Sequence, residues 1–506
     1  MKDDERHVWI HGGVATHFRP LSRDDKSVLS IDKAHISSSS RLLRVRVRQR
    51  QKAARLLCLS WSNDEHSRWF PDHEIVFTQP ISHTEDLFGG KDDASFARAN
   101  PSVSLWSSAS TGRLAVATTA LSQGSCVLRA TAFAVGVHDH GASSFCHWCF
   151  SRLSKKAFRC GGCSFALYCS HKCLEADAPL HDFQCQVLPW IRQRQPAPLE
   201  VDNETLRLVL SILSMEQLIQ TTTALAKLHI PPRKRRKDLK HVAHGLQRVI
   251  QSTTNVQIPL EHIVETIERV QTNAHPLYLN GATICGLGIF PEAAMTLNHS
   301  CSPNVVPSFD PATRTLRFYA IRDIQRLDMI EYSYLSDLSI GVKRRRETLK
   351  DGFGFECHCL RCETEARRQD GANDDTTENQ VLTQLMATLQ DDKASANLES
   401  LRREVGSLLE RRSDLAFAFD MVELRRAVRR LAWQDVTRLA QGLLDQWRAQ
   451  GLPEHYPTTE TLYQQLLVAA KRLGDTRNMT TAQEAIRATQ QNCGYVLPPV
   501  EVSSQP

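Results

Sequence analysis

Hydrophobic positions follow different periods along the chain, and these periods predict where helices and strands lie. Apolar residues three or four positions apart predict helices across 203–270, and the same spacing predicts almost continuous helices across 379–492. Short apolar runs separated by glycine and proline predict strands and turns across 282–335. Two further strands are expected on either side of Gly124. Strands in the centre followed by a helical end indicate an α+β protein.

The first 95 residues show no sustained period of either kind. They contain a serine run, Ser37–Ser40, and a basic stretch from Arg41 to Arg55. We expect this segment to be an extension that is at least partly disordered. A second polar segment, Gln369–Glu378, predicts a boundary in front of the C-terminal helices.

The apolar runs, the N-terminal residues and the charge of the chain indicate where it acts in the cell. No run approaches the roughly 20 apolar residues that cross a bilayer, and the charged N-terminus lacks the apolar core of a secretory signal. We therefore expect a monomer in the nucleus and/or cytoplasm that has no membrane partner. The net charge of +6 is small for 506 residues. The basic run Pro231–Lys237 is expected to be an exposed loop or a localisation signal, and DNA binding is not expected.

The cysteines carry most of the chemical information. Among fifteen in all, ten fall into two clusters, 146–185 and 357–362, mostly as closely spaced pairs. In a reducing compartment such pairs indicate metal sites rather than disulfides.

The first cluster offers eight soft ligands within forty residues. They are Cys146, Cys149, Cys160, Cys163, Cys169, Cys173, His181 and Cys185. Because zinc takes four such ligands in a tetrahedron, eight ligands predict two ions. The spacing alone allows either interleaved or sequential pairing of the four pairs. The segment is too short for an apolar core, so metal is expected to supply much of its folding free energy.

The second cluster, Cys357, Cys359 and Cys362, is one ligand short of a structural zinc site. We expect the fourth ligand to come from elsewhere in the fold. Cys301 is the best candidate because of the segment that surrounds it, and His358 is a weaker one.

That segment is the heptapeptide Asn298–Asn304. It precedes a strand-like run, Leu316–Ile324, then Tyr332-Ser-Tyr334, then the second cysteine cluster. Together these motifs closely resemble the signature of SET lysine methyltransferases. The first cluster, with Tyr168, Phe183 and Gln184 inside it, resembles the MYND zinc finger. Their order is similar to that of the SET-and-MYND (SMYD) family over about residues 104–365, and the C-terminal helices look like the family's TPR-like domain, with Ala485–Gly494 resembling its closing helix.

The resemblance implies a fold, ligands and roles. The fold would be a split SET β-fold with an inserted MYND finger, a post-SET cysteine segment and a C-terminal all-α domain. The finger would be interleaved, with Cys146, Cys149, Cys169 and Cys173 on one ion and Cys160, Cys163, His181 and Cys185 on the other. Cys301 would complete the third zinc site. S-adenosylmethionine would be the cofactor.

The resemblance also assigns the site. Gly112, Arg113, Asn298 and His299, together with Phe353 and Phe355, would lie against the cofactor. Tyr334 would be the channel tyrosine that orients the lysine amine, and Tyr332 is a second candidate because the sequence does not exclude a shift of two positions.

Three departures from the family pattern bear on activity. Thr111 stands where lysine is usual, and the glycine expected after Arg113 is missing, which removes close backbone approach to the cofactor. One additional residue lies between Pro291 and Asn298. Phe353 stands where tyrosine is usual, and loss of that hydroxyl is expected to alter the number of methyl groups added.

These inferences predict a protein-lysine N-methyltransferase that acts on histone or other proteins, with a zinc-dependent adaptor as the alternative. Its MYND finger is expected to bind partner peptides. The predicted order of parts is an extension (1–95), the first SET part (96–145), the finger (146–185), a helical insert (186–275), the SET core (276–340), a post-SET segment (341–366) and a helical domain (377–497).

Overall fold

A computed structural model describes residues 96–108, 112–196, 201–222, 225–231, 236–279, 283–369 and 398–495, positions 380 and 383, and strands within the first 80 residues. These early strands are β1 (Glu5–Ile10), β2 (Ile31–Ile36), β3 (Leu43–Arg48), β4 (Leu56–Cys58) and β5 (Val76–Pro80). The sequence pattern did not predict them. The predicted disorder elsewhere in 1–95 and the linker at 370–378 lie outside the described residues.

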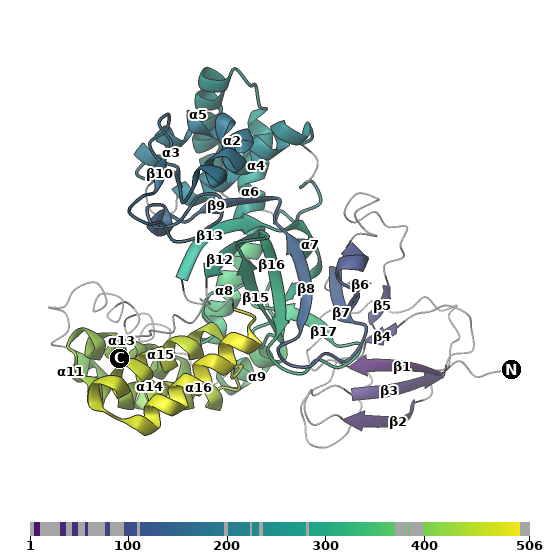
Figure 1. Cartoon of the computed structure of the whole chain (residues 1–506). Helices are drawn as coiled ribbons and strands as arrows, with labels where there is room; N and C mark the ends of the chain where they lie inside the picture. Colours follow the sequence, from purple (N-terminus) through teal and green to yellow (C-terminus); the bar gives the residue numbers. More distant parts are fainter. Residues whose placement is uncertain are drawn as a thin grey trace.

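Three β-sheets form the centre of the molecule (Figure 1). Their strands are β6 (Val103–Ser108), β7 (Gly112–Ala117), β8 (Cys126–Thr131), β9 (Ala134–Val137), β12 (Ala274–Leu279), β13 (Thr283–Ile289), β14 (Asn298–His299), β15 (Val305–Asp310), β16 (Thr315–Ala320) and β17 (Met329–Tyr332). The sheet orders are β14-β17-β7-β6-β5-β4, β15-β16-β8 and β12-β13-β9.

The two strands predicted around Gly124 are β7 and β8, and they belong to different sheets. β7 pairs with β6 and β17, whereas β8 pairs with β16. The predicted strand region also contains one short helix, α7 (Pro291–Thr296), which begins with proline at its first turn. The additional residue between Pro291 and Asn298 lies in this helix or in the step from it to β14.

A helical lobe stands above the sheets in Figure 1 and carries the cysteine-rich finger. Its elements are the 3-10 turn η1 (Asp139–Gly141), strands β10 (Phe158–Arg159) and β11 (Leu167–Tyr168), and helices α2 (His171–Cys185), α3 (Leu188–Gln193), α4 (Asn203–Ile219), α5 (Arg236–Thr254) and α6 (Leu260–Asn273). The expected helices of 203–270 are α4, α5 and α6. Residues 232–235 of the predicted basic loop are outside the described part, and Arg236 already begins α5.

The chain then forms α8 (Val342–Phe353) and α9 (Leu360–Gln369), followed by the predicted C-terminal helices. These are α11 (Leu398–Glu404), α12 (Gly406–Arg411), α13 (Ser413–Arg429), α14 (Trp433–Ala449), α15 (Pro457–Leu473) and α16 (Thr476–Asn492). Among the described residues, no helix is long and apolar enough to cross a membrane. The α+β class with a cysteine-rich insertion and a helical end is confirmed.

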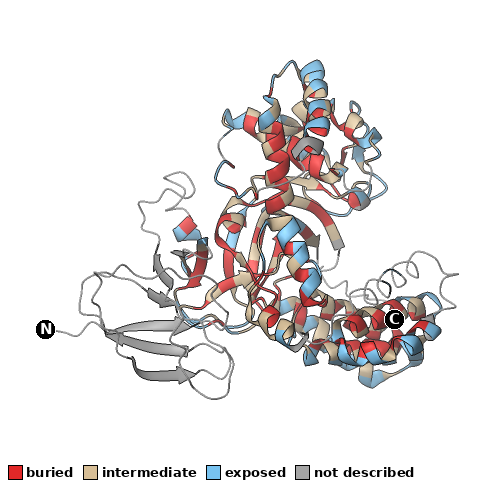
Figure 2. Ribbon diagram, turned by 180° about the vertical axis from the view of Figure 1, so that it is seen from behind, coloured by how far each residue is buried: buried red, intermediate tan, exposed pale blue. Residues whose placement is uncertain are grey.

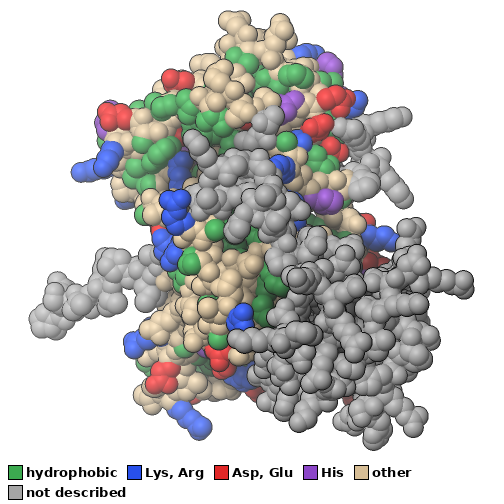
Figure 3. All heavy atoms as spheres, turned by 90° about the vertical axis from the view of Figure 1, so that its right-hand side faces the viewer, with side chains coloured by type: hydrophobic (Ala, Val, Ile, Leu, Met, Phe, Trp, Pro, Cys, Tyr) green, Lys and Arg blue, Asp and Glu red, His purple; other side chains and the backbone are tan. Residues whose placement is uncertain are grey.

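Buried side chains are concentrated in the sheets and on the inner faces of the helices (Figure 2). One apolar core fills the sheets around Leu128 and Phe318, a second joins the finger to α4 and α6, and a third lies among the C-terminal helices around Trp447. The face in Figure 3 presents both acidic and basic side chains. The finger and the sheets thus meet through packed elements rather than through a free linker.

Candidate functional site

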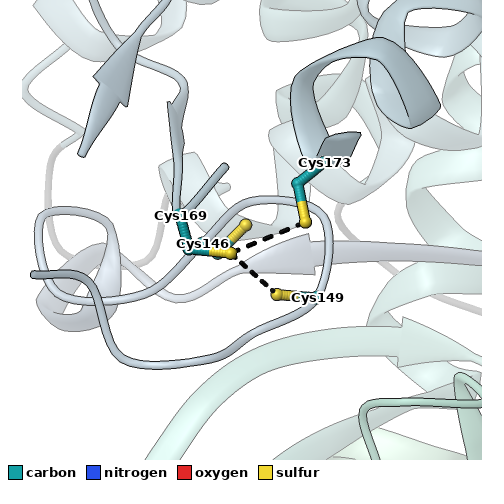
Figure 4. Close-up of side chains that lie close together, drawn as sticks. All are labelled: Cys146, Cys149, Cys169 and Cys173. Atoms are coloured by element: carbon teal, nitrogen blue, oxygen red, sulfur yellow. Dashed lines mark hydrogen bonds between the residues drawn. The ribbon is translucent and has the colours of Figure 1, made fainter. Parts of the chain in front are cut away.

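The first finger site is formed by Cys146, Cys149, Cys169 and Cys173 (Figure 4). Their sulfur atoms all lie within 4.8 Å of one another, and Sγ of Cys169 is 3.5 Å from that of Cys149 and 3.6 Å from that of Cys173. Thiolates at the corners of a zinc tetrahedron are about 3.8 Å apart, given Zn–S bonds of about 2.3 Å. The group therefore fits zinc without rearrangement.

The second finger site is formed by Cys160, Cys163, His181 and Cys185. His181 reaches the thiols from α2 with Nε2, which lies 3.3 Å from Sγ of Cys160 and 3.6 Å from Sγ of Cys163. The first site uses the first and third ligand pairs along the chain, and the second site uses the second and fourth pairs. The arrangement is interleaved, as the resemblance implied, and the sequential alternative does not occur.

The third site joins Cys301 to Cys357, Cys359 and Cys362. Sγ of Cys301 lies 3.5 Å from Sγ of Cys362 and 3.9 Å from Sγ of Cys357. His358 is not a member, because its Nδ1 contacts Oε1 of Glu363 at 2.8 Å. With this site the chain offers ligand sets for three zinc ions.

Two buried arginines that sequence analysis did not single out surround the third site. Arg345 donates to Sγ of Cys362 at 3.5 Å and to Oε2 of Glu365 at 2.7 Å. Arg361 donates to the carbonyl of Cys301. Burial alone would lower the pKa of Arg345, but the neighbouring Cys362 and Glu365 raise it above its ordinary value. Positive charge is thus held beside a set of thiolates that would carry excess negative charge.

The heptapeptide is tied to β17 at both ends. β14 pairs in parallel with β17, with Asn298 opposite Glu331 and His299 opposite Tyr332. At the other end, the side chain of Asn304 donates to the carbonyl of Met329 at 2.7 Å and accepts from the Glu331 amide at 2.9 Å. The loop between these ends carries Cys301 into the third zinc site.

The predicted cofactor residues of the first SET part lie beside this loop. Nδ2 of Asn298 donates to the carbonyl of Arg113 at 2.8 Å, although 185 positions separate the two residues. Gly112 has a φ of +68°, and among the described residues, its chain neighbours aside, no atom lies within 4 Å of where its Cβ would be. Thr111 lies outside the described residues.

His299 is a buried residue whose two ring nitrogens are both engaged. Nδ1 accepts from the backbone amide of Tyr334 at 2.9 Å, so the ring hydrogen is on Nε2, which lies 3.2 Å from Sγ of Cys301. The ring therefore links Tyr334 to the third zinc site. The ring nitrogens of His299 are therefore not free to form a hydrogen bond with a cofactor.

Tyr334 lies within a group of aromatic rings. Ring-centre distances are 4.9 Å to Phe353, 5.0 Å to Tyr332 and 6.2 Å to Phe355. Its hydroxyl donates to the carbonyl of Leu297 at 2.7 Å. Burial, and secondarily the charge of Glu331, raise the pKa of Tyr334, so the hydroxyl stays protonated at neutral pH.

Tyr332, the other candidate, is in a different environment. It is 9% exposed, and its hydroxyl forms a hydrogen bond of 2.9 Å with Nε2 of His275 on β12. Sequence analysis missed His275, because a single histidine in a strand gives no signal of its partner.

Comparison with known proteins agrees with this geometry. Residues 146–185 match the family model described as the MYND finger. The chain is 28% identical to N-lysine methyltransferase SMYD2 of Rattus norvegicus over 251 residues, which is 47% of this chain and 54% of that protein. It is 26% identical to SMYD2-A of Xenopus laevis over 269 residues, covering 51% and 59%. The chain thus contains a MYND finger and is similar to N-lysine methyltransferases over about half its length.

The chain spans about half the length of the curated relatives it matches. One solved structure, titled "Crystal structure of the SET domain of LSMT bound to Lysine and AdoHcy", aligns over 80% of this chain and 90% of that chain at 12% identity. Its TM-score of 0.27 is too low to bear on ligands or mechanism.

Proposed function

We propose that this chain is a protein-lysine N-methyltransferase that uses S-adenosylmethionine. One relationship carries the proposal: the hydrogen bond from Asn298 to the Arg113 carbonyl joins the loop at Gly112 to the heptapeptide. His299, the next residue, then holds the amide of Tyr334. The cofactor-side residues and the channel tyrosine are thereby linked through two neighbouring side chains.

The residues at this site are suited to binding S-adenosylmethionine. The loop at Gly112, which Asn298 holds through the Arg113 carbonyl, would face the cofactor, and Phe353 and Phe355 would border the site beside Tyr334. When bound, S-adenosylmethionine supplies a sulfonium methyl, which passes to a neutral lysine amine as an N–C bond forms and the C–S bond breaks. The buried aromatic group around Tyr334 disfavours the charged ammonium and so favours loss of its proton. Tyr334 would orient the amine lone pair toward the methyl.

The residue that follows Arg113, where the family's second glycine is missing, has a buried side chain. Leu114, which follows Arg113 directly, is 5% exposed and packs with Trp106 and Val116. Adjacent residues of a strand point to opposite faces, so Leu114 and Arg113 lie on different sides of β7. The Leu114 side chain is therefore packed in the core and does not project toward the side of β7 that carries Arg113.

The test measures cofactor binding and chemistry separately. Calorimetry of the zinc-loaded protein with S-adenosylmethionine should give saturable binding, and lysine peptides should gain methyl groups by mass spectrometry. Tyr334→Phe should lower kcat by about a hundredfold while cofactor binding is retained. The control Tyr463→Phe removes a buried tyrosine hydroxyl that accepts from Arg448 in the C-terminal helices and should be active.

Absence of cofactor binding by the zinc-loaded protein would refute the enzyme and favour a zinc-dependent adaptor. The finger and the C-terminal helices would then bind partner proteins without chemistry. For either function, we propose nuclear and/or cytoplasmic action on protein partners, with partner peptides bound by the MYND finger.

A further inference from the structure

His275 lies at the centre of an apolar, aromatic part of the core. It is 3% exposed, and its ring is edge-to-face with Phe290 at 5.8 Å and with Phe318 at 6.4 Å between ring centres. Against Tyr332 it is stacked, at 5.7 Å and 18° between planes. Burial lowers the pKa of His275 to about 4, against a smaller opposing effect of the Asn273 backbone. The imidazole is therefore neutral at physiological pH.

A hydrogen bond to Tyr332 anchors this neutral ring. Nε2 is 2.9 Å from the hydroxyl of Tyr332, and the backbone of Asn273 is the other polar group that acts on the ring. A buried hydroxyl that loses its partner is costly, whereas replacing both partners by apolar groups of similar shape can be nearly neutral. The bond thus fixes the orientation of the Tyr332 side chain.

Tyr332 in turn contacts Tyr334. Their ring centres are 5.0 Å apart, and Tyr332 is braced on another side by Phe318 at 5.2 Å. Tyr334 has its own anchors at the backbone of Leu297 and at His299. The Tyr334 ring is also bordered by the rings of His299 at 5.3 Å and Phe353 at 4.9 Å, and Tyr332 completes this group.

We propose that His275 is a positioning residue that acts through Tyr332 on Tyr334; this inference rests on the proposed methyltransferase function. His275 touches neither the amine nor the cofactor in this scheme. It holds the Tyr332 hydroxyl inside the core, and the fixed Tyr332 ring sets the place of the Tyr334 ring. When His275 alone is lost, the Tyr332 hydroxyl has no buried hydrogen-bond partner. The Tyr332 ring then rotates toward another partner and displaces Tyr334.

The test is a double-mutant cycle of His275→Phe, Tyr332→Phe and the double variant, with Tyr463→Phe as a remote control. The native protein is first shown to bind S-adenosylmethionine and to methylate a lysine peptide. Each variant is then measured for kcat per cofactor-binding site, for KM of the peptide and for the midpoint of thermal unfolding.

For His275→Phe, kcat should fall between about tenfold and about a hundredfold, with KM changed less than about twofold. Its unfolding midpoint should fall by a few degrees. The double variant should recover both quantities, because no buried hydroxyl is then left without a partner. Counting only cofactor-binding sites removes losses that come from unfolding alone.

Two results would overturn the inference while leaving the proposed function intact. One is a His275→Phe protein with native kcat per cofactor site. The other is a double variant as impaired as His275→Phe, which would mean that the histidine ring matters for a reason other than the Tyr332 hydroxyl. A native protein that binds no cofactor or transfers no methyl group would instead refute the proposed function, and the inference with it.

Discussion

The guanidinium carbon of Arg314 lies 3.5 Å from the centre of the Trp148 ring, and the same side chain donates to the Trp148 carbonyl at 2.8 Å. Arg314 is in the turn between β15 and β16, at a φ of +50°, and Trp148 lies between two ligands of the first finger site. The contact fastens the finger to the sheets.

Arg314→Ala should loosen the finger. Loss of one cation–π contact and one hydrogen bond is expected to lower the local free energy of opening by about 1–3 kcal/mol. Hydrogen exchange should therefore speed up at amides of 146–150. Arg326→Ala is the control, because Arg326 is exposed and its side chain donates to the carbonyl of Thr118 rather than to a residue of the finger. Equal exchange in both variants would contradict the role of Arg314.

Interleaving of the finger can be tested by metal content. The native protein should hold three zinc ions per chain. Cys149→Ala combined with Cys169→Ala removes two ligands of one site, so about two ions should remain. Sequential pairing would place these residues on different ions and predicts about one. Metal analysis by mass spectrometry, with Cys493→Ala as a control outside all three sites, distinguishes the two outcomes.

Arg345→Met should weaken the third zinc site. The variant keeps most of the side-chain volume but leaves the thiolates without their buried positive neighbour, and a loss of about 10–100-fold in zinc affinity is expected. Competition with a chelator measures it. Arg344→Met on the same helix is the matched control, because Arg344 is exposed. Native retention of zinc by the Arg345 variant would show that the thiolates need no such compensation.

His275 should also contribute to acid sensitivity. Its pKa is lowered to about 4 in the folded chain, below the 6.5 of the unfolded chain. The unfolded state therefore binds more protons between these values, so the contribution of His275 to stability is present above pH 6.5 and declines as pH falls toward 4. The full decline is about 3 kcal/mol at most.

The measurement for this prediction is the free energy of unfolding from pH 7 down to 5. It should fall less steeply with acidification in the His275→Phe, Tyr332→Phe double variant than in the native protein. Parallel curves would show that His275 titrates normally, contrary to its burial among Phe290, Phe318 and Tyr332.

Sequence patterns predicted the parts of this molecule that depend on local spacing. Helical periods located α4, α5 and α6, and the spacing of the cysteine pairs identified the finger ligands. The membership of Cys301 in the third site was expected only because its surrounding heptapeptide resembles a known signature. What spacing alone left open was the interleaving, since either pairing places the ligands within reach.

Tertiary contacts account for what the sequence did not reveal. β7 and β8 were recognisable as strands, but their separation into two sheets depends on partners far along the chain. Arg345 and His275 carry no motif, and each gains its place only when a distant element packs against it. Tyr332 and Tyr334 are two positions apart and look equivalent in sequence; their hydroxyl partners, His275 for Tyr332 and the Leu297 carbonyl for Tyr334, distinguish them.

Interleaving has a consequence for synthesis on the ribosome. The first site cannot close until Cys173 has emerged, and the second waits only twelve residues longer, for Cys185. The early pairs at Cys146 and Cys160 must therefore stay reduced and unligated, or hold metal incompletely, while the rest of the finger is translated. The two zinc sites are then completed almost together, so the nascent finger folds in one late step rather than in two successive ones.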